Sequence, residues 1–224
     1  MADITMDMVK QLRQQTGAGI MDCKTALSES EGDHAKALEW IKKKGLAKAE
    51  KRAGAIAADG MVHAYIHPGS RLGVLVEINC QTDFVARGDE FKQFADGVGL
   101  QIASMNAQFV RREEVPEDDR AKQKEIFQAQ LAEEAAKTGK EKPANVVEKI
   151  VEGKLDKWLG EVCLDEQASV VDNDKTIKVL ADELTGRLGE RISVRRFVRY
   201  ELGEGIEKKS GDLASEVAAT IAGS

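Results

Sequence analysis

The sequence predicts an α+β fold, and three observations lead to that prediction. Residues 61–80 alternate between apolar and polar side chains, as two neighbouring strands do. Residues 191–202 repeat the alternation near the far end of the chain. Elsewhere, apolar side chains recur mostly at helical spacing. We therefore expect a three-stranded antiparallel sheet with helices on one face.

The composition is that of a helix-rich protein without a membrane segment. At 224 residues the chain can form one domain of ordinary size plus a small one. Its net charge of −6 argues against a protein that mainly binds nucleic-acid phosphates. We find no apolar run of 18 residues and no basic-then-apolar secretory signal. Three widely spaced cysteines fit a reduced, cytoplasmic compartment.

Residues 1–54 are predicted to form a separate helical module and the start of a tether. Glycine-containing breaks separate three short stripes of apolar residues at helical spacing. The stripes are Met8, Val9 and Leu12; Ile20, Met21, Cys23, Ala26 and Leu27; and Ala37, Leu38, Trp40 and Ile41. The third helix is expected to end near Gly45, with residues 47–60 as the tether. So small a bundle is marginally stable by size, and we expect it to depend on contacts with something else.

Residues 55–224 are predicted to form the α+β core. A hairpin turns at Pro68-Gly69-Ser70, and helices are expected at 88–105 and 175–188. The alternating apolar residues of the hairpin are Val62, Ala64, Ile66, Leu72, Val74, Val76, Ile78 and Cys80. Those of the last strand are Ile192, Val194, Val198, Tyr200 and Leu202. Arg196 interrupts this apolar side, so we expect a bulge or a rim position there.

A densely charged segment, residues 117–158, is predicted to be a helical hairpin that projects from the core. Helical stretches at about 117–136 and 144–158 flank a turn containing glycine and proline. Their apolar stripes are Ile126, Phe127, Leu131 and Ala135, and Val147, Ile150, Val151, Leu155 and Trp158. Periodicity does not decide between a structural extension and a partner-binding arm.

The corner after the second strand is the most informative part of the sequence. Gln81, Thr82 and Asp83 favour a turn or a helix cap, and a large aromatic side chain, Phe84, follows them. One interpretation is a staple that packs the next helix onto the sheet. The other is a side chain presented on a rigid corner for insertion into a partner. The local pattern alone favours the staple.

The sequence contains no convincing enzyme site. No phosphate-binding glycine loop followed by Lys-Ser or Lys-Thr is present. His63 and His67 share a strand face, but no cysteine or carboxylate cluster completes a metal site, so we interpret them as exposed strand residues. Cys80 could be a nucleophile, yet its place in the apolar alternation favours a buried, inert thiol. We expect no bound metal, cofactor or nucleotide.

Four stretches resemble the elongation factor Ts family, the guanine-nucleotide exchange factors of elongation factor Tu. They are LRQQTGAGIMDCK at 12–24, EINCQTDFV at 77–85, VEGK at 151–154 and LGEGIEK at 202–208. The resemblance spans nearly the whole chain, in order. It reverses the preference at Phe84, which now favours insertion into a partner.

The resemblance implies both an architecture and a set of contacts. Members have an N-terminal three-helix module similar to ubiquitin-associated domains, an α+β core and a projecting helical hairpin. In this family an Asp-Phe pair, here Asp83 and Phe84, enters the nucleotide-binding domain of elongation factor Tu beside its Mg²⁺ site, and Thr82 and Val85 flank the pair. The N-terminal module contacts the same domain. Its matching positions here are Arg13, Ile20 and Met21.

The implied function is nucleotide exchange in the cytoplasm without covalent catalysis. The protein would release GDP from elongation factor Tu so that GTP can rebind. Longer members carry two related core copies, whereas this chain has one and short members dimerise, so we expect a homodimer. We expect no contact with nucleic acid or a membrane. Two alternatives stay open: an adaptor that binds ubiquitin-like partners through residues 1–54, with an unrelated core, and a thiol enzyme that uses Cys80.

Overall fold

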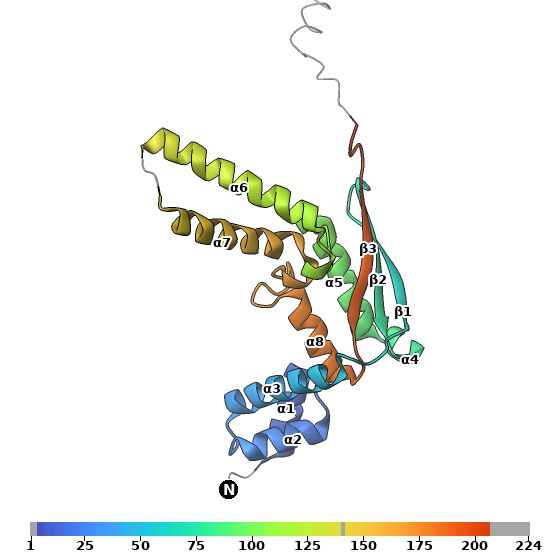
Figure 1. Cartoon of the computed structure of the whole chain (residues 1–224). Helices are drawn as coiled ribbons and strands as arrows, with labels where there is room; N and C mark the ends of the chain where they lie inside the picture. Colours follow the sequence, from blue (N-terminus) through green and yellow to red (C-terminus); the bar gives the residue numbers. More distant parts are fainter. Residues whose placement is uncertain (1–3, 140–141, 207–224) are drawn as a thin grey trace, which may run out of the picture.

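The computed structural model describes residues 4–139 and 142–206, which form an N-terminal helical module, an α+β core and a projecting hairpin (Figure 1). The α-helices are α1 (Met6–Thr16), α2 (Ile20–Glu29), α3 (His34–Arg52), α4 (Asp83–Ala86), α5 (Asp89–Met105), α6 (Glu117–Thr138), α7 (Ala144–Val162) and α8 (Ile177–Leu188). Two short 3₁₀ helices are η1 (Arg112–Glu114) and η2 (Leu164–Glu166). The strands are β1 (Asp59–Ile66), β2 (Leu72–Cys80) and β3 (Ser193–Glu201). The predicted α+β class is confirmed.

The N-terminal module consists of α1, α2 and α3 packed around a small aliphatic core. Its fully buried side chains are Leu12, Cys23, Ala26, Leu27 and Ala37. Thr5 caps α1 by accepting a hydrogen bond from the Met8 amide, and Asp33 caps α3 through two backbone amides. Gly17 ends α1 at φ 65°, a backbone conformation that favours glycine.

Helix α3 is longer than the sequence predicted. It continues through Gly45 to Arg52, so the expected end near Gly45 is wrong and the tether is only residues 53–58. Gly45 lies against Gly186 of α8, where an added Cβ on Gly186 would lie 2.8 Å from the Gly45 Cα. The glycine pair therefore serves the close approach of two helices rather than a break in one of them. This contact seats the module on the core.

The sheet is antiparallel in the order β1-β2-β3, and its inner face is covered by helices. The β2 side chains that point to this face are Val74, Val76, Ile78 and Cys80, and all four are buried. They share a core with Phe91 and Ile102 of α5 and with Leu184 of α8. Helix α5 approaches β1 most closely at Gly99, where a Cβ would lie 2.6 Å from the Tyr65 Cβ.

A bulge in β3 divides its apolar residues between the two faces of the sheet. Ile78 is paired with Val194, but Glu77 is paired with Arg196, so Arg195 is the extra residue. The expected bulge is therefore confirmed. The expectation of one apolar side along the whole strand is wrong, because the extra residue reverses the alternation. Val194 faces the core, whereas Val198 lies on the open face.

Strand β1 is also turned differently from the prediction. His63 and His67 were expected to be exposed, but both are half-buried, and His63 Nε2 lies 3.0 Å from Asp96 of α5. Helix α5 covers this face of the strand because Tyr65 and Gly99 fit closely together. The apolar residues Val62, Ala64 and Ile66 occupy the opposite, exposed face.

Helices α6 and α7 project away from the core as the predicted hairpin (Figure 1). At its base, Arg112 pairs with Glu166 and, at 2.5 Å, with Asp156 of α7. A separate small cluster of buried apolar side chains, Val115, Leu159, Val162 and Cys163, packs there. None of the helices described is both long and apolar enough to cross a membrane.

Candidate functional site

The corner between β2 and α5 contains a one-turn helix that the sequence pattern did not resolve. Thr82 has extended backbone angles and caps α4, because its hydroxyl accepts a hydrogen bond from the Val85 amide at 3.5 Å. Val85 is half-buried against the main core, and Ala86 is 5% exposed. The inward residues of this turn therefore attach it to the core, while its first residues face solvent.

Phe84 projects from this corner into solvent. Its side chain is 84% exposed. Beside it, Asp83 forms an exposed ion pair with Arg87 at 2.9 Å. Phe91, one helical segment later, fills the core instead. The staple interpretation of Phe84 is thus wrong, because an aromatic side chain that packs a helix onto a sheet would be buried.

Glu190, which was not among the predicted site residues, holds the corner from the loop between α8 and β3. Its carboxylate accepts hydrogen bonds from the amides of Gln81 and Thr82, both at 3.0 Å. It also accepts one from the Thr82 hydroxyl at 2.7 Å. Glu190 is more than 100 positions from the corner in the chain, so no local pattern could have revealed the contact.

Cys80 lies under the corner and does not resemble a nucleophile. Its side chain is fully buried, and its thiol donates a hydrogen bond to the Thr82 carbonyl oxygen at 3.1 Å. Desolvation by burial raises the pKa of this thiol, so it is protonated at neutral pH. No three His, Cys, Asp or Glu side chains gather as a metal site within residues 4–139 and 142–206.

The other predicted contact residues lie on the N-terminal module. Ile20 and Met21 begin α2, directly after Gly19, and their side chains are 47% and 71% exposed. Arg13 is exposed in the last turn of α1. The predicted contact residues Thr82, Asp83, Phe84 and Val85 thus lie together in one turn. The other three, Arg13, Ile20 and Met21, lie on the N-terminal module, at the same end of the molecule as α4 (Figure 1).

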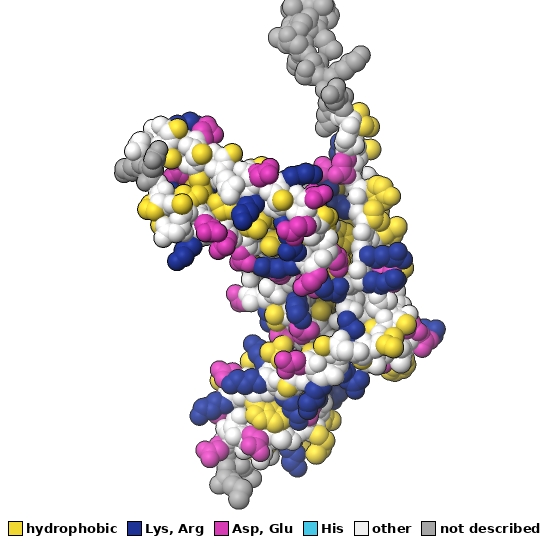
Figure 2. All heavy atoms as spheres, viewed as in Figure 1, with side chains coloured by type: hydrophobic (Ala, Val, Ile, Leu, Met, Phe, Trp, Pro, Cys, Tyr) yellow, Lys and Arg dark blue, Asp and Glu magenta, His cyan; other side chains and the backbone are white. Residues whose placement is uncertain are grey.

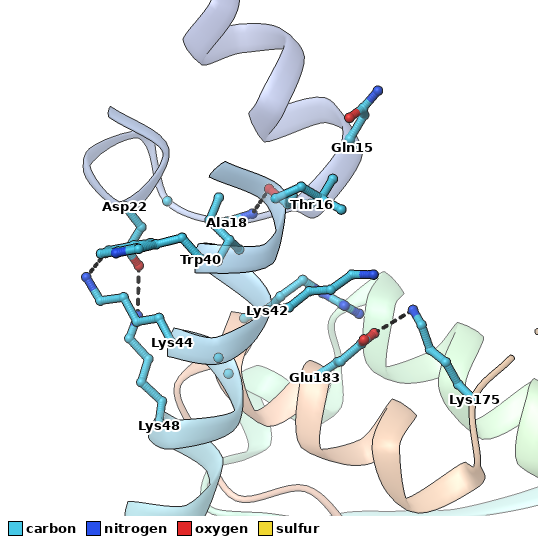
Figure 3. A pocket seen from close by; sticks show the side chains of 16 residues that line it. Gln15, Thr16, Ala18, Asp22, Trp40, Lys42, Lys44, Lys48, Lys175 and Glu183 are labelled. Carbon is cyan, nitrogen blue, oxygen red and sulfur yellow. Dashed lines mark hydrogen bonds and ion pairs between the residues drawn. The ribbon is translucent and has the colours of Figure 1, made fainter. Parts of the chain in front are cut away.

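Asp22 fixes the beginning of α2 to α3. Its carboxylate accepts hydrogen bonds from Lys44 at 3.0 Å and Lys48 at 2.8 Å (Figure 3). These hydrogen bonds, that from Lys48 first, lower the pKa of Asp22, so it stays ionised. The same figure shows Lys175 and Glu183 of the core across the cleft between module and α8. The neighbouring Met21 is therefore presented from an ordered helix start.

Comparison with known proteins decides the family. The family model described as Elongation factor TS matches residues 6–204. The chain belongs to the elongation factor Ts family. Elongation factor Ts of Desulforamulus reducens is 53% identical over 221 residues, 99% of each chain. Elongation factor Ts of Carboxydothermus hydrogenoformans is 55% identical over 218 residues, 97% of this chain and 98% of that protein.

Membership makes this chain a translation elongation factor. Elongation factor Ts of Myxococcus xanthus is also 50% identical over 99% of both chains. These relatives are covered almost from end to end, so they are of nearly the same length as this chain. The matched region includes the Phe84 corner and the surface of the N-terminal module together.

Proposed function

We propose that this elongation factor Ts family member binds elongation factor Tu in its GDP-bound form and promotes release of GDP. The observation that carries the proposal is the exposure of Phe84 on a corner fixed from the core. Asp83 and Phe84 would enter beside the Mg²⁺ and phosphate site of the partner, with Thr82 and Val85 shaping the turn. The protein would act in the cytoplasm, where translation takes place.

The physical mechanism is a disturbance of the partner's metal coordination. A nucleotide held at nanomolar affinity corresponds to about −12 kcal/mol, so its unaided release is slow. Mg²⁺ demands nearly ideal octahedral geometry and bridges the nucleotide phosphates to the protein that holds them. A side chain wedged against the surrounding loops needs to shift them only slightly to spoil that geometry. Phe84 therefore does not have to touch the nucleotide.

Exchange then follows from thermodynamic linkage. The chain must bind nucleotide-free elongation factor Tu more tightly than the nucleotide-bound form. By reciprocity, a nucleotide that binds afterwards weakens the hold of the exchange factor by the same factor. GTP can thus replace GDP and release the chain. No covalent bond forms or breaks in this cycle, so the chain acts as a binding protein.

The N-terminal module would provide a second contact with the same partner. Ile20 and Met21 are exposed apolar side chains on an ordered helix start, and Arg13 is exposed in the preceding helix. Methionine and arginine are enriched at protein interfaces, whose centre is apolar and whose rim is polar. The contact between Gly45 and Gly186 seats this module on the core. The module would therefore reach the partner in a defined orientation.

The open face of the sheet supports a homodimer. Its pairing places Ala64, Leu75 and Val198 side by side in one cross-strand row, and the next row contains Ile66 and Tyr200. Hydrophobic side chains gather along the outer side of the sheet, away from α5 (Figure 2). A two-fold axis through this face would cover it by one self-complementary contact. Each dimer would bind two molecules of elongation factor Tu.

Neither alternative gains support from a specific observation. Burial and the raised pKa of Cys80 argue against a thiol enzyme. The family match over residues 6–204 spans module and core together, which argues against an adaptor with an unrelated core.

The deciding experiment follows release of fluorescent GDP from purified elongation factor Tu in the presence of excess unlabelled GDP. We expect the release rate to rise with the concentration of added chain. Binding of the chain to elongation factor Tu without faster release of GDP would favour the adaptor hypothesis instead. A Cys80→Ser variant distinguishes the thiol-enzyme hypothesis from the exchange hypothesis. A thiol enzyme would lose its activity in this variant, whereas nucleotide exchange should be retained.

A further inference from the structure

We propose that Glu190 is a positioning residue that aims Phe84, and that its loop also holds the corner to the N-terminal module. This inference deepens the proposed exchange function and rests on it. It concerns residues that come from three distant parts of the chain: the end of α3, the corner after β2, and the loop that joins α8 to β3. The polar contacts among these three parts carry the argument.

Helix α4 needs support from outside its own turn. It has four residues, and a helix of one turn is unstable alone because nucleation is costly. The ladder between β1 and β2 ends at Cys80, so the amides of Gln81 and Thr82 have no strand partner. Glu190 accepts hydrogen bonds from both amides. One carboxylate therefore satisfies the two backbone donors between the strand and the helix.

Glu190 also orients the residue that caps α4. The Thr82 hydroxyl donates to the Glu190 carboxylate at 2.7 Å, so its oxygen is left to accept from the Val85 amide. The carboxylate thus selects the Thr82 rotamer that caps α4. Hydrogen bonds to an ionised acceptor are stronger than neutral ones.

The residues next to Glu190 and Thr82 extend this hydrogen-bond network to the N-terminal module. The Gln81 side-chain oxygen accepts from the Arg191 amide at 3.3 Å and from the Arg52 guanidinium at 3.1 Å. Arg191 itself donates to the Ala55 carbonyl oxygen at 2.8 Å. Arg52 ends α3 and bonds directly to the corner, whereas Arg191 of the loop bonds both to Gln81 of the corner and to Ala55, three residues after α3. The two candidate contact regions are therefore linked by polar contacts.

The consequence concerns Phe84, whose side chain is too exposed to be fixed by packing. Its direction depends on the backbone of α4, which Glu190 holds at its start while Val85 and Ala86 pack its end against the core. A corner held in one conformation avoids the cost of ordering on binding. If the corner populated several conformations, apparent affinity would fall in proportion to the competent fraction.

The test compares Glu190→Gln with the matched control Glu183→Gln. Glutamine has the same shape, but it places an NH₂ donor against groups that are themselves donors. Glu183 is also a glutamate, in the middle of α8, and its carboxylate pairs with Lys175 rather than with the corner. In the free protein, amide hydrogen exchange at Gln81 and Thr82 should accelerate about tenfold in Glu190→Gln and stay unchanged in the control.

The second measurement is a double-mutant cycle for GDP release with Phe84→Ala. Glu190→Gln alone should slow stimulated release roughly tenfold. In the Phe84→Ala background, Glu190→Gln should slow stimulated GDP release by less than about twofold further, because no aromatic side chain is left to position. Effects that multiply would overturn the proposal, since a general loss of structure acts in either background. Unchanged amide exchange in Glu190→Gln would also overturn it. If the parent itself fails to stimulate GDP release from elongation factor Tu, the proposed function fails, and amide exchange alone decides the positioning role.

Discussion

Two exposed apolar regions of this molecule are built in opposite ways. The corner presents one aromatic side chain, Phe84, from a single helical turn held by polar contacts. The open face of the sheet presents many partly exposed side chains from three paired strands: Val62, Ala64, Ile66, Leu75, Val198 and Tyr200. The corner therefore offers a partner a single side chain, whereas the open face offers a broad apolar surface.

The difference indicates two kinds of association. A single buried aromatic anchor can dominate a reversible contact, which suits a factor that must bind and leave in every cycle. A broad apolar surface is typical of permanent homodimers. The two regions have different supports as well, since one depends on a side-chain network and the other on strand pairing. Substitutions should therefore damage one property without the other.

The largest expected effect is on the dimer, through Leu75→Glu. Leu75 lies in the central row of the open face, between Ala64 and Val198. In a two-fold interface the substitution is made twice, and each unpaired buried charge costs several kcal/mol. We expect a dimer for the parent and a monomer for the variant by light scattering at micromolar concentration.

The matched control is Val171→Glu, which places the same charge at a side chain that is 70% exposed outside the sheet. It should remain a dimer. A monomer mass for the parent protein would contradict the dimer hypothesis and would leave the exchange hypothesis unaffected. Both variants should keep the parent's circular dichroism spectrum, because neither side chain belongs to the core.

The next effect is on exchange, through Phe84→Ala. Truncating a central aromatic anchor costs roughly 2–4 kcal/mol at an interface. Stimulated GDP release should slow at least about tenfold, while the thermal unfolding midpoint and the mass by light scattering stay as in the parent. Val171→Ala, also a truncation of an exposed apolar side chain, should stimulate GDP release from elongation factor Tu as the parent does. A folded Phe84→Ala protein with parental activity would refute the role of the corner.

A smaller effect is expected for the module surface, through the double substitution Ile20→Ala and Met21→Ala. Two partly exposed apolar side chains at an interface contribute roughly 1–2 kcal/mol, so the concentration of chain needed for half-maximal GDP release should rise about tenfold. Met6→Ala tests the specificity, because Met6 is 61% exposed in the same module. An equal rise in that concentration for Met6→Ala would mean that these substitutions act by destabilising the module and not by removing a contact with the partner.

The sequence predicted the elements well where one physical rule determines them. The hairpin helices and α5 follow from helical periodicity, and the inner face of β2 follows from alternation. The rule failed in β3, where one extra residue, Arg195, exchanges the two faces. It also failed at Gly45, because a glycine that permits helix contact looks the same in sequence as a glycine that ends a helix.

The candidate site was only partly accessible from the sequence. Local pattern found the corner but favoured a buried Phe84, and the family resemblance corrected that preference. Neither source found Glu190, because its contact with Thr82 spans 108 positions and is made by a residue type common on surfaces. Long-range polar contacts of this kind depend on how α8 and β2 pack, which periodicity does not specify.

The smallest effect concerns the charged row that borders the open face. The bulge places Arg195 and Arg196 together, and both donate to the Glu77 carboxylate, at 2.7 and 2.6 Å. These hydrogen bonds, that from Arg195 first, lower the pKa of Glu77 to about 2 from an ordinary value of 4.5. If the open face and the corner are independent, changes at Glu77 should alter stability and leave GDP release unaffected.

The sign of the pH dependence follows from that shift. Because the folded pKa lies below the unfolded one, the unfolded state binds more protons as pH falls below about 4.5, and the stabilisation is lost progressively toward pH 2. Glu77→Gln should therefore lower the unfolding midpoint modestly at pH 7, and its difference from the parent should shrink between these pH values at fixed protein concentration. Glu201→Gln, at an exposed carboxylate of β3 paired with Arg199, is the control. A difference that stayed constant with pH would show that Glu77 stabilises the bulge by its shape and not by its charge.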